Sequence, residues 1–394
     1  MLVFKLLLGI SFMDKKNIIL IATDGVRADS ISSFKNFEKL SKQGTFFSNA
    51  MSYAPYSIAS FHAIFTGIYG NRNGVDNYYG VSQFKMDNCK TLTSYLHEVG
   101  YYTIGDIMNK IVVPHDGFDE LSIADPTRDI FPKHKQIIEK CGELKKTGKN
   151  FFAFLHCDYV HNSLIRDVVK QYTDFSKEYF ENKKENKKRY ESYIQNADDY
   201  LSKLMDEITR QNIQDSIILI FSDHGCSLGE KIGEKVYGSF CYDYTIMSFG
   251  IFLNNELFPK REFSQLVRTI DFMPTILDIL QIPHDKRKME LDGKSLMGFI
   301  CKEESESRIG FSETGGLGGP YPSPEAPNVH CIRTNKWKLI FNKTPKTYEL
   351  YDLKNDPEEL NNLFGSKEYQ KIQNDLLKDL RRHVMRLKEW LKQK

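Results

Sequence analysis

Short, uninterrupted runs of apolar residues recur along the chain, and each predicts a strand that is buried on both faces. The first run covers residues 18–22 and stops just before Asp24, and further runs cover 101–104, 151–155 and 216–221. Segments with helical periodicity lie between them. Because strands that alternate with helices usually form parallel sheets, the pattern predicts an α/β fold with a mostly parallel central sheet flanked by helices.

Polar residues follow three of these runs. Asp24 follows the first run, Asp158 and His161 follow the third, and Asp223 with His224 follow the fourth. Ligands of parallel sheets bind beyond the carboxyl ends of the strands, so we expect these side chains at one edge. Carboxylates with imidazoles suit zinc or another divalent transition metal better than calcium, which prefers oxygen ligands. The alternative at each strand end is a polar turn with a structural histidine and no site.

A serine lies at the predicted start of a helix. The stretch from Pro55 to Gly67 has apolar residues at helical spacing, which predicts a helix that begins near Ser57 and ends at Gly67. Free backbone N–H groups at such an end favour an anion. A hydroxyl beside a metal ion can act as a nucleophile on a phosphoryl or sulfuryl centre. An N-cap serine without catalytic role is the structural alternative.

The pattern changes beyond about residue 310. Residues 331–341 and 348–352 are typical of antiparallel strands, and residues 368–394 of a long amphipathic helix. We therefore predict three parts, which are an N-terminal extension (1–16), a catalytic domain (17–310) and a C-terminal subdomain with a small antiparallel sheet and a terminal helix (311–394).

Composition narrows the class of protein. The chain has 394 residues and a formal net charge of +2, so no nucleic-acid partner is expected. Its seven cysteines include no CxxC pair, which favours reduced thiols.

Residues 1–12 resemble the start of a signal peptide, but the apolar stretch is too short to span a bilayer and no small-x-small cleavage site follows. We expect a cytoplasmic protein without a membrane span, translated from Met1 or Met13, and the oligomeric state stays open.

Motifs distributed over most of the chain resemble those of the alkaline phosphatase superfamily, and within it those of the sulfatases. The resemblance implies an alkaline-phosphatase-like fold and a metal-dependent hydrolase or transferase of phosphate or sulfate esters. The motifs that carry it, in chain order, lie at 17–29, 57–67, 91–100, 117–120, 220–230, 269–280, 291–296 and 349–363.

The chain departs from the sulfatase pattern at its signature. Sulfatases resemble one another in a Cys/Ser-x-Pro/Ala-Ser-Arg sequence whose first residue becomes formylglycine. The corresponding stretch begins at Ser57 and has Phe61 where the arginine is expected. The lysine and histidine of a second sulfatase segment are also absent, at 105–108. The opening Asp24-Gly-x-Arg-x-Asp is instead similar to nucleotide pyrophosphatase/phosphodiesterases, which use an unmodified hydroxyl and two zinc ions.

The resemblance implies a set of metal ligands. Asp24, Asp223 and His224 would bind the metal, and Ser57 would be both nucleophile and ligand. Asp158 is a further candidate ligand, although it is out of the expected register. Zn²⁺ or Mn²⁺ is favoured, Mg²⁺ or Ca²⁺ is compatible, and one or two ions are expected.

Other residues are expected to act on the substrate. His161 and Lys235 are candidates for assisting the reaction. Arg27, Tyr237 and His330 are candidates for substrate binding. A plain salt bridge is an equally good interpretation of Arg27, and His330 is either a ligand of a second metal or structural.

The favoured hypothesis is hydrolysis or transfer of a phosphoester, because a phosphoryl group on an unmodified serine can be released by water activated at a metal. A serine sulfate has no equally easy exit. A true sulfatase is the first alternative, and a degenerate member that binds an anion or glycan without turnover is the second. The substrate class is a small anionic ester or a phosphorylated or sulfated glycan. The natural substrate, and whether Ser57 becomes formylglycine, stay open.

Overall fold

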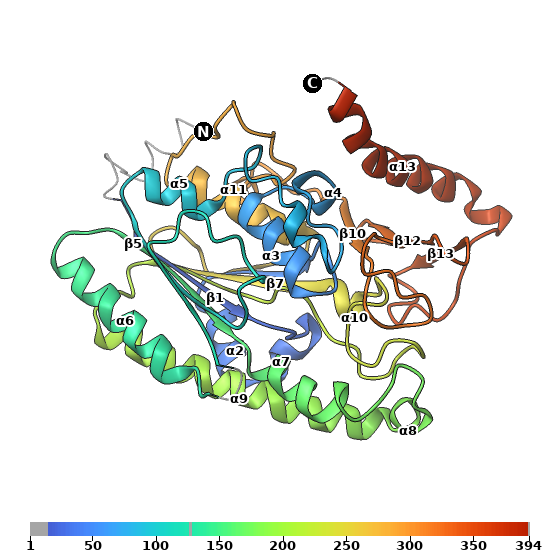
Figure 1. Cartoon of the computed structure of the whole chain (residues 1–394), viewed down its shortest axis with the longest axis horizontal. Coiled ribbons are helices and arrows are strands. Elements are labelled where there is room, and N and C mark those ends of the chain that lie inside the picture. The colour runs from blue at the N-terminus through green and yellow to red at the C-terminus, as the bar shows by residue number, and fades with distance from the viewer. Residues whose placement is uncertain (1–14, 126–127, 393–394) are drawn as a thin grey trace.

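A nine-stranded sheet forms the centre of the computed structural model, which describes residues 15–125 and 128–392 (Figure 1). Its strands, in spatial order, are β4 (Glu120–Ile123), β3 (Tyr102–Ile107), β5 (Phe151–Cys157), β1 (Ile18–Thr23), β6 (Ile217–Phe221), β7 (Met247–Leu253), β2 (Thr45–Met51) and β8 (Arg261–Phe263), while β9 (Val267–Arg268) also pairs with β2.

The central sheet is mostly parallel, as the sequence predicts. The five strands from β4 to β6 run parallel to one another, and β7 runs antiparallel to both of its neighbours. The four apolar runs in the sequence correspond to β1, β3, β5 and β6. The pattern did not indicate β4, because this edge strand is largely exposed and has no apolar run.

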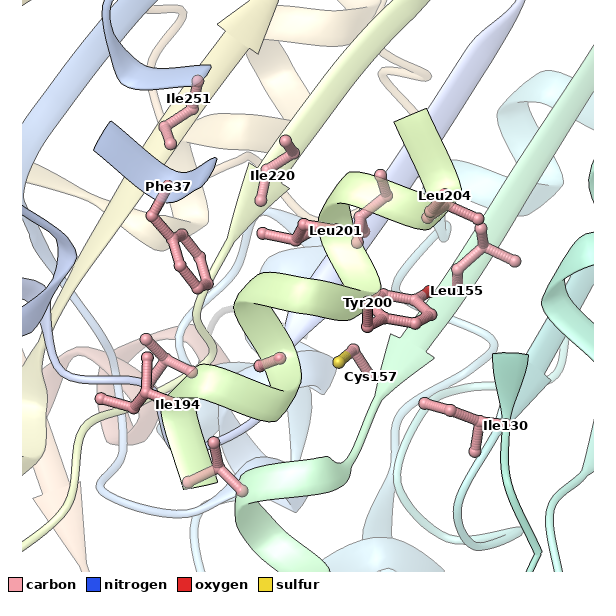
Figure 2. Close-up of a cluster of buried hydrophobic side chains, with 14 of the residues drawn as sticks. Phe37, Ile130, Leu155, Cys157, Ile194, Tyr200, Leu201, Leu204, Ile220 and Ile251 are labelled. Carbon is pink, nitrogen blue, oxygen red and sulfur yellow. The ribbon is translucent and has the colours of Figure 1, made fainter. Parts of the chain in front are cut away.

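Side chains of β1 alternate between two buried cores, which explains why residues 18–22 are all apolar. Ile19 and Ile21 pack with residues of α2 (Lys35–Ser41), α6 (Phe131–Lys146) and α9 (Lys183–Arg210). Figure 2 shows this core, where α9 lies against β5 and β6. Ile18 and Leu20 pack on the other face, below α3 (Ser57–Thr66), α5 (Leu92–Glu98) and α11 (Phe272–Ile279). β1 is therefore buried on both faces, and it lies between β5 and β6 in the middle of the sheet.

The charged stretch 165–212 is not one continuous helix. Residues 170–176 are outside any helix and connect a π-helical segment (Ile165–Val169) to α8 (Lys177–Glu181) and α9. The reason is tertiary, because Asp174 in this break accepts backbone N–H groups from Lys235 and Gly319. The chain leaves the helical path to make these contacts.

A second, antiparallel sheet lies beside the central one. Its strands are β10 (Gly310–Thr314), β11 (Val329–Arg333), β12 (Trp337–Asn342) and β13 (Thr347–Asp352). Leu376 and Leu380 of α13 (Gln370–Lys392) cover this sheet (Figure 1). Ion pairs join this sheet to α10 (Asp243–Ile246), which directly precedes β7, since Asp243 contacts both Arg333 and Lys338.

Within residues 15–125 and 128–392, no helix is long and apolar enough to cross a membrane.

Short helical segments complete the fold. The short segments are α4 (Gly70–Asn73), α7 (Tyr159–Leu164), α10 (Asp243–Ile246), α12 (Met297–Ile300), η1 (Ala28–Ser33), η2 (Gly80–Gln83), η4 (Thr269–Asp271) and η5 (Lys367–Tyr369).

A buried carboxylate on α9 holds the start of α2. Asp198 Oδ1 accepts the N–H groups of Asn36 (3.0 Å) and Phe37 (2.8 Å), which have no partner within their own helix.

Asp198→Ala should lower the free energy of unfolding by about 2 kcal/mol, because two buried donors lose their acceptor. Urea denaturation measures the change. Asp199→Ala, which removes the adjacent exposed carboxylate, is the matched control, and an equal loss in both variants contradicts the assignment.

Candidate metal and catalytic site

The loops that follow β1, β5 and β6 meet at the carboxyl edge of the sheet. The strands end in register, with Ala22 of β1 opposite His156 on one side and Phe221 on the other. Beyond this level, Gly25 N–H donates to Asp223 Oδ1 at 3.3 Å. The parallel register therefore brings together residues that are about 200 positions apart in the sequence.

Three of the predicted ligands form a compact buried group. Asp24, Asp223 and His224 each offer one ligand atom, and these atoms all lie within 4.8 Å of one another. All three residues are fully buried. Asp223 Oδ2 has no hydrogen-bond partner among the residues that the structure describes. An unpartnered carboxylate oxygen beside an imidazole fits a divalent transition metal ion, which would compensate its charge.

Electrostatics at this group favours a cation. Burial raises the pKa of Asp223, and the nearby negative charge of Asp24 raises it further. The pKa of Asp24 is lowered, since the charge of His161 and the hydrogen bond from His156 outweigh the opposing effect of burial. A second carboxylate charge is thus costly here unless a cation joins the group.

Ser57 lies directly against the ligand group. It is the first residue of α3, after the extended Tyr56, and its Oγ donates to Asp24 Oδ2 at 3.0 Å. The same Oγ lies 3.3 Å from His224 Nε2. The side chain does not cap its own helix, so the N-cap alternative does not describe it. The structure therefore presents this hydroxyl to the three ligands, at the positive end of a buried ten-residue helix.

Two histidines contact Asp24 from β5 and the residues after it. His156 Nε2 lies 3.0 Å from Asp24 Oδ2, and His161 Nδ1 lies 3.3 Å from Asp24 Oδ1. Burial alone would lower the pKa of each histidine, but the interaction with Asp24 raises it. His156 is a site residue that was not predicted from the sequence. The available signal was a single ionisable residue inside an otherwise apolar strand.

Tyr237 covers the two histidines that face the site. Its hydroxyl lies 3.2 Å from His161 Nδ1, and its ring centroid lies 4.8 Å from that of His224. The sequence analysis placed Tyr237 among the substrate-binding candidates, and the structure brings it to the site.

Asp158 is buried but lies outside the group of three ligands. Its backbone carbonyl accepts the N–H of Asn162 at the start of α7, and burial raises the pKa of its carboxyl. The group of three ligand atoms does not include its carboxyl, so the expectation that it binds the same metal finds no support among these contacts.

Two basic candidates have partners elsewhere. The Lys235 ammonium donates to the carbonyl of Tyr172 at 2.8 Å. The Arg27 guanidinium forms salt bridges with Asp29 and Glu230, so of its two interpretations the salt bridge matches its contacts. Neither side chain contacts a member of the ligand group in the part of the chain that the structure describes, because both are already paired.

His330 also has another partner. It lies on β11, where its Nδ1 is 2.8 Å from Glu313 Oε1. Although burial would raise the pKa of Glu313, the hydrogen bond from His330 helps to lower it to about 2. Of the two interpretations in the sequence analysis, the structural one matches these contacts.

A mostly parallel sheet, with candidate metal ligands in the loops at its carboxyl edge and a serine at a helix N-terminus, is typical of the alkaline-phosphatase-like class of α/β proteins. The chain belongs to the sulfatase family. The sequence model described as Sulfatase matches residues 16–282, and that described as N-sulphoglucosamine sulphohydrolase, C-terminal, matches residues 240–386. This family is generally metal-dependent.

Curated relatives match only part of their own length. An N-acetylglucosamine-6-O-sulfatase of Bacteroides thetaiotaomicron is 26% identical over 204 residues, which are 48% of this chain and 35% of the relative. A choline-sulfatase of Rhizobium meliloti is 29% identical over 188 residues, which are 46% and 34% of the two chains.

Solved structures agree with the fold over almost the whole chain. One, described as a complex with its substrate D-glucosamine-2-N,6-O-disulfate, has a TM-score of 0.73 at 18% identity and covers 95% of this chain and 98% of its own. A phosphonate monoester hydrolase of Agrobacterium radiobacter has a TM-score of 0.71 at 15% identity, with 94% and 96% covered. At these identities the likeness establishes the fold.

Metal binding can be tested on the folded protein directly. Adding Zn²⁺ or Mn²⁺ to metal-free protein should raise the midpoint temperature of unfolding, since a ligand in 100-fold excess over its Kd adds about 2.7 kcal/mol to stability. Asp223→Asn should remove most of this increase and weaken binding in isothermal titration calorimetry. Asp158→Asn is the matched buried control. Equal loss in both variants, or none in Asp223→Asn, contradicts the ligand assignment. Affinity should fall as the pH falls, because protons compete for the ligands.

Proposed function

We propose that this sulfatase-family protein is a metal-dependent hydrolase of phosphate or sulfate esters in which Ser57 is the nucleophile, and that phosphoesters are its preferred substrates. One observation carries the proposal, namely that Ser57 Oγ lies between Asp24 Oδ2 at 3.0 Å and His224 Nε2 at 3.3 Å. A hydroxyl held among metal ligands is the arrangement that nucleophilic attack on an ester requires.

The residues of the site have separable roles in this proposal. Asp24, Asp223 and His224 hold the cation, which when bound would lower the pKa of the Ser57 hydroxyl and stabilise developing negative charge. His156 fixes the orientation of Asp24 through its Nε2. His161 and Tyr237 share a hydrogen bond at 3.2 Å beside Asp24, and in our proposal they donate to the oxygens of an anion.

The choice of phosphate over sulfate rests on the groups near Ser57. Where sulfatases have their signature arginine, Phe61 packs in the core with its ring centroid 5.0 Å from that of His156. Lys235 and Arg27 are paired elsewhere. An unmodified serine in these surroundings favours transfer of a phosphoryl group. A true sulfatase is the second candidate, because curated relatives carry sulfatase names.

The substrate class that we propose is a small anionic ester or a phosphorylated or sulfated glycan. Support comes from relatives, which include an N-acetylglucosamine-6-O-sulfatase, and from the fold neighbour described with a sulfated glucosamine. We further propose a cytoplasmic location. Six buried cysteines, at positions 89, 141, 157, 226, 241 and 331, are free thiols, which is consistent with a reducing compartment.

Turnover of aryl esters tests the nucleophile. Metal-free protein is reconstituted separately with Zn²⁺, Mn²⁺, Mg²⁺ and Ca²⁺ and assayed on an aryl phosphate monoester, a phosphate diester and a sulfate. Ser57→Ala should lower kcat by about 10³-fold or more, because no other hydroxyl replaces the attacking group. Ser216→Ala, a buried serine at the amino end of β6, is the matched control and should keep wild-type activity.

The outcomes separate the candidates. Full activity in Ser57→Ala contradicts the proposed mechanism. Preferred turnover of the sulfate, with an aldehyde at Ser57 in mass spectrometry, identifies a true sulfatase. Metal binding without turnover of any of the three esters indicates a binding protein instead.

A further inference from the structure

Tyr237 reaches the candidate site from a tight loop, residues 234–240, which we name the Tyr237 loop. The loop leaves the segment after β6 and returns toward α10. No helix or strand includes it, so other contacts must hold the Tyr237 hydroxyl at 3.2 Å from His161 Nδ1. The contacts that hold this loop in place therefore also hold one wall of the site in place.

A buried carboxyl group closes the loop from inside. Glu234 Oε1 accepts the backbone N–H groups of Ser239 at 2.8 Å and Phe240 at 2.9 Å, so it joins the two ends of the loop. Glu234 has no exposed surface. Its backbone carbonyl accepts the Ser227 hydroxyl at 2.8 Å, which ties the same residue to the segment that follows His224.

The C-terminal sheet supports the loop from outside. Thr314 Oγ1, at the end of β10, donates to the carbonyl of Gly238 at 2.5 Å. Gly238 has a φ of +94°, which a residue with a side chain rarely adopts. Gly316 packs so closely that a Cβ atom there would come within 1.9 Å of the same carbonyl oxygen. The loop thus has little freedom on this side.

The remaining oxygen of the carboxyl group, Glu234 Oε2, is also buried. Burial raises the pKa of Glu234 to about 8, although the two backbone amides and the Tyr244 side chain act against this rise. An ionisable group that is buried here is retained at a cost in stability, which its hydrogen bonds to the loop amides offset.

We infer that Glu234 is a positioning residue for the proposed reaction, and that it acts by closing the Tyr237 loop so that the Tyr237 hydroxyl stays on His161. The inference rests on the proposed function for its catalytic consequence only. The structural consequence, which is the closure of the loop, is independent of any turnover.

Substitutions at Glu234 test the role of its hydrogen-bond acceptor. Glu234→Gln keeps an acceptor oxygen at the same reach and should have kcat/KM close to the wild-type value on the best aryl ester. Glu234→Ala removes the acceptor and should lower kcat/KM about ten- to a hundredfold, because two buried amides lose their partner and the loop opens. Glu207→Ala, which removes a buried carboxylate from α9, is the matched control and should leave kcat/KM unchanged.

The action through Tyr237 is tested by a double variant. If Glu234 works by placing Tyr237, then Glu234→Ala combined with Tyr237→Phe should have a kcat/KM no lower than the more impaired single variant, since the two changes remove the same interaction. Losses that multiply show that Glu234 acts independently of Tyr237 and overturn the inference. Should Glu234→Ala not fold, Glu234→Asp, whose shorter side chain cannot reach both amides, replaces it.

Hydrogen exchange tests loop closure without any substrate. The amides of Ser239 and Phe240 should exchange faster in Glu234→Ala than in the wild type, Glu234→Gln and Glu207→Ala. Unchanged exchange overturns the inference whether or not the protein turns over an ester. Faster exchange in a protein that hydrolyses none of the three aryl esters supports loop closure while the proposed function fails. Faster exchange with full activity refutes the catalytic consequence alone.

Discussion

The burial of two carboxylates at one edge of the sheet is the constraint on which the site depends. Asp24 and Asp223 are both without exposure, and a ligand atom of each lies within 4.8 Å of the other and of His224. In a medium of low polarity two such charges repel strongly unless positive charge joins them. The parallel register of β1 and β6 forces this proximity. The fold therefore places two carboxylates where a cation and the neighbouring imidazoles would compensate their negative charge.

Positive charge near Asp24 comes from histidines rather than from arginine or lysine. His156 and His161 lie on its two oxygens, at 3.0 and 3.3 Å. An imidazole can hold or release a proton near neutral pH, whereas a guanidinium carries a permanent charge. The site therefore differs in kind from one built around the sulfatase signature arginine, whose position is occupied here by the core residue Phe61. This difference from other members of the family is the basis of our proposal that phosphoesters are the preferred substrates.

Much of the fold could be predicted because burial on both faces leaves a plain pattern. The apolar runs at 18–22 and 216–221 have no polar residue to accommodate, and both are strands next to each other in the sheet. The helix at Ser57 was equally clear from its apolar spacing and terminal Gly67. The edge strand β4 and the break at 170–176 left no such pattern, since exposed residues tolerate any polarity and tertiary hydrogen bonds decide the path.

By itself, the sequence determined that Asp24, Ser57, Asp223 and His224 follow strand ends or begin a helix, because local apolar patterns specify these positions. Only the tertiary structure decided which side chains share the site. It added His156, which the apolar pattern of its strand does not mark as a site residue. It also paired Lys235 with the backbone carbonyl of a residue far away in the sequence. Which side chains meet depends on distances between segments that are far apart in the chain, and a local sequence pattern does not give those distances.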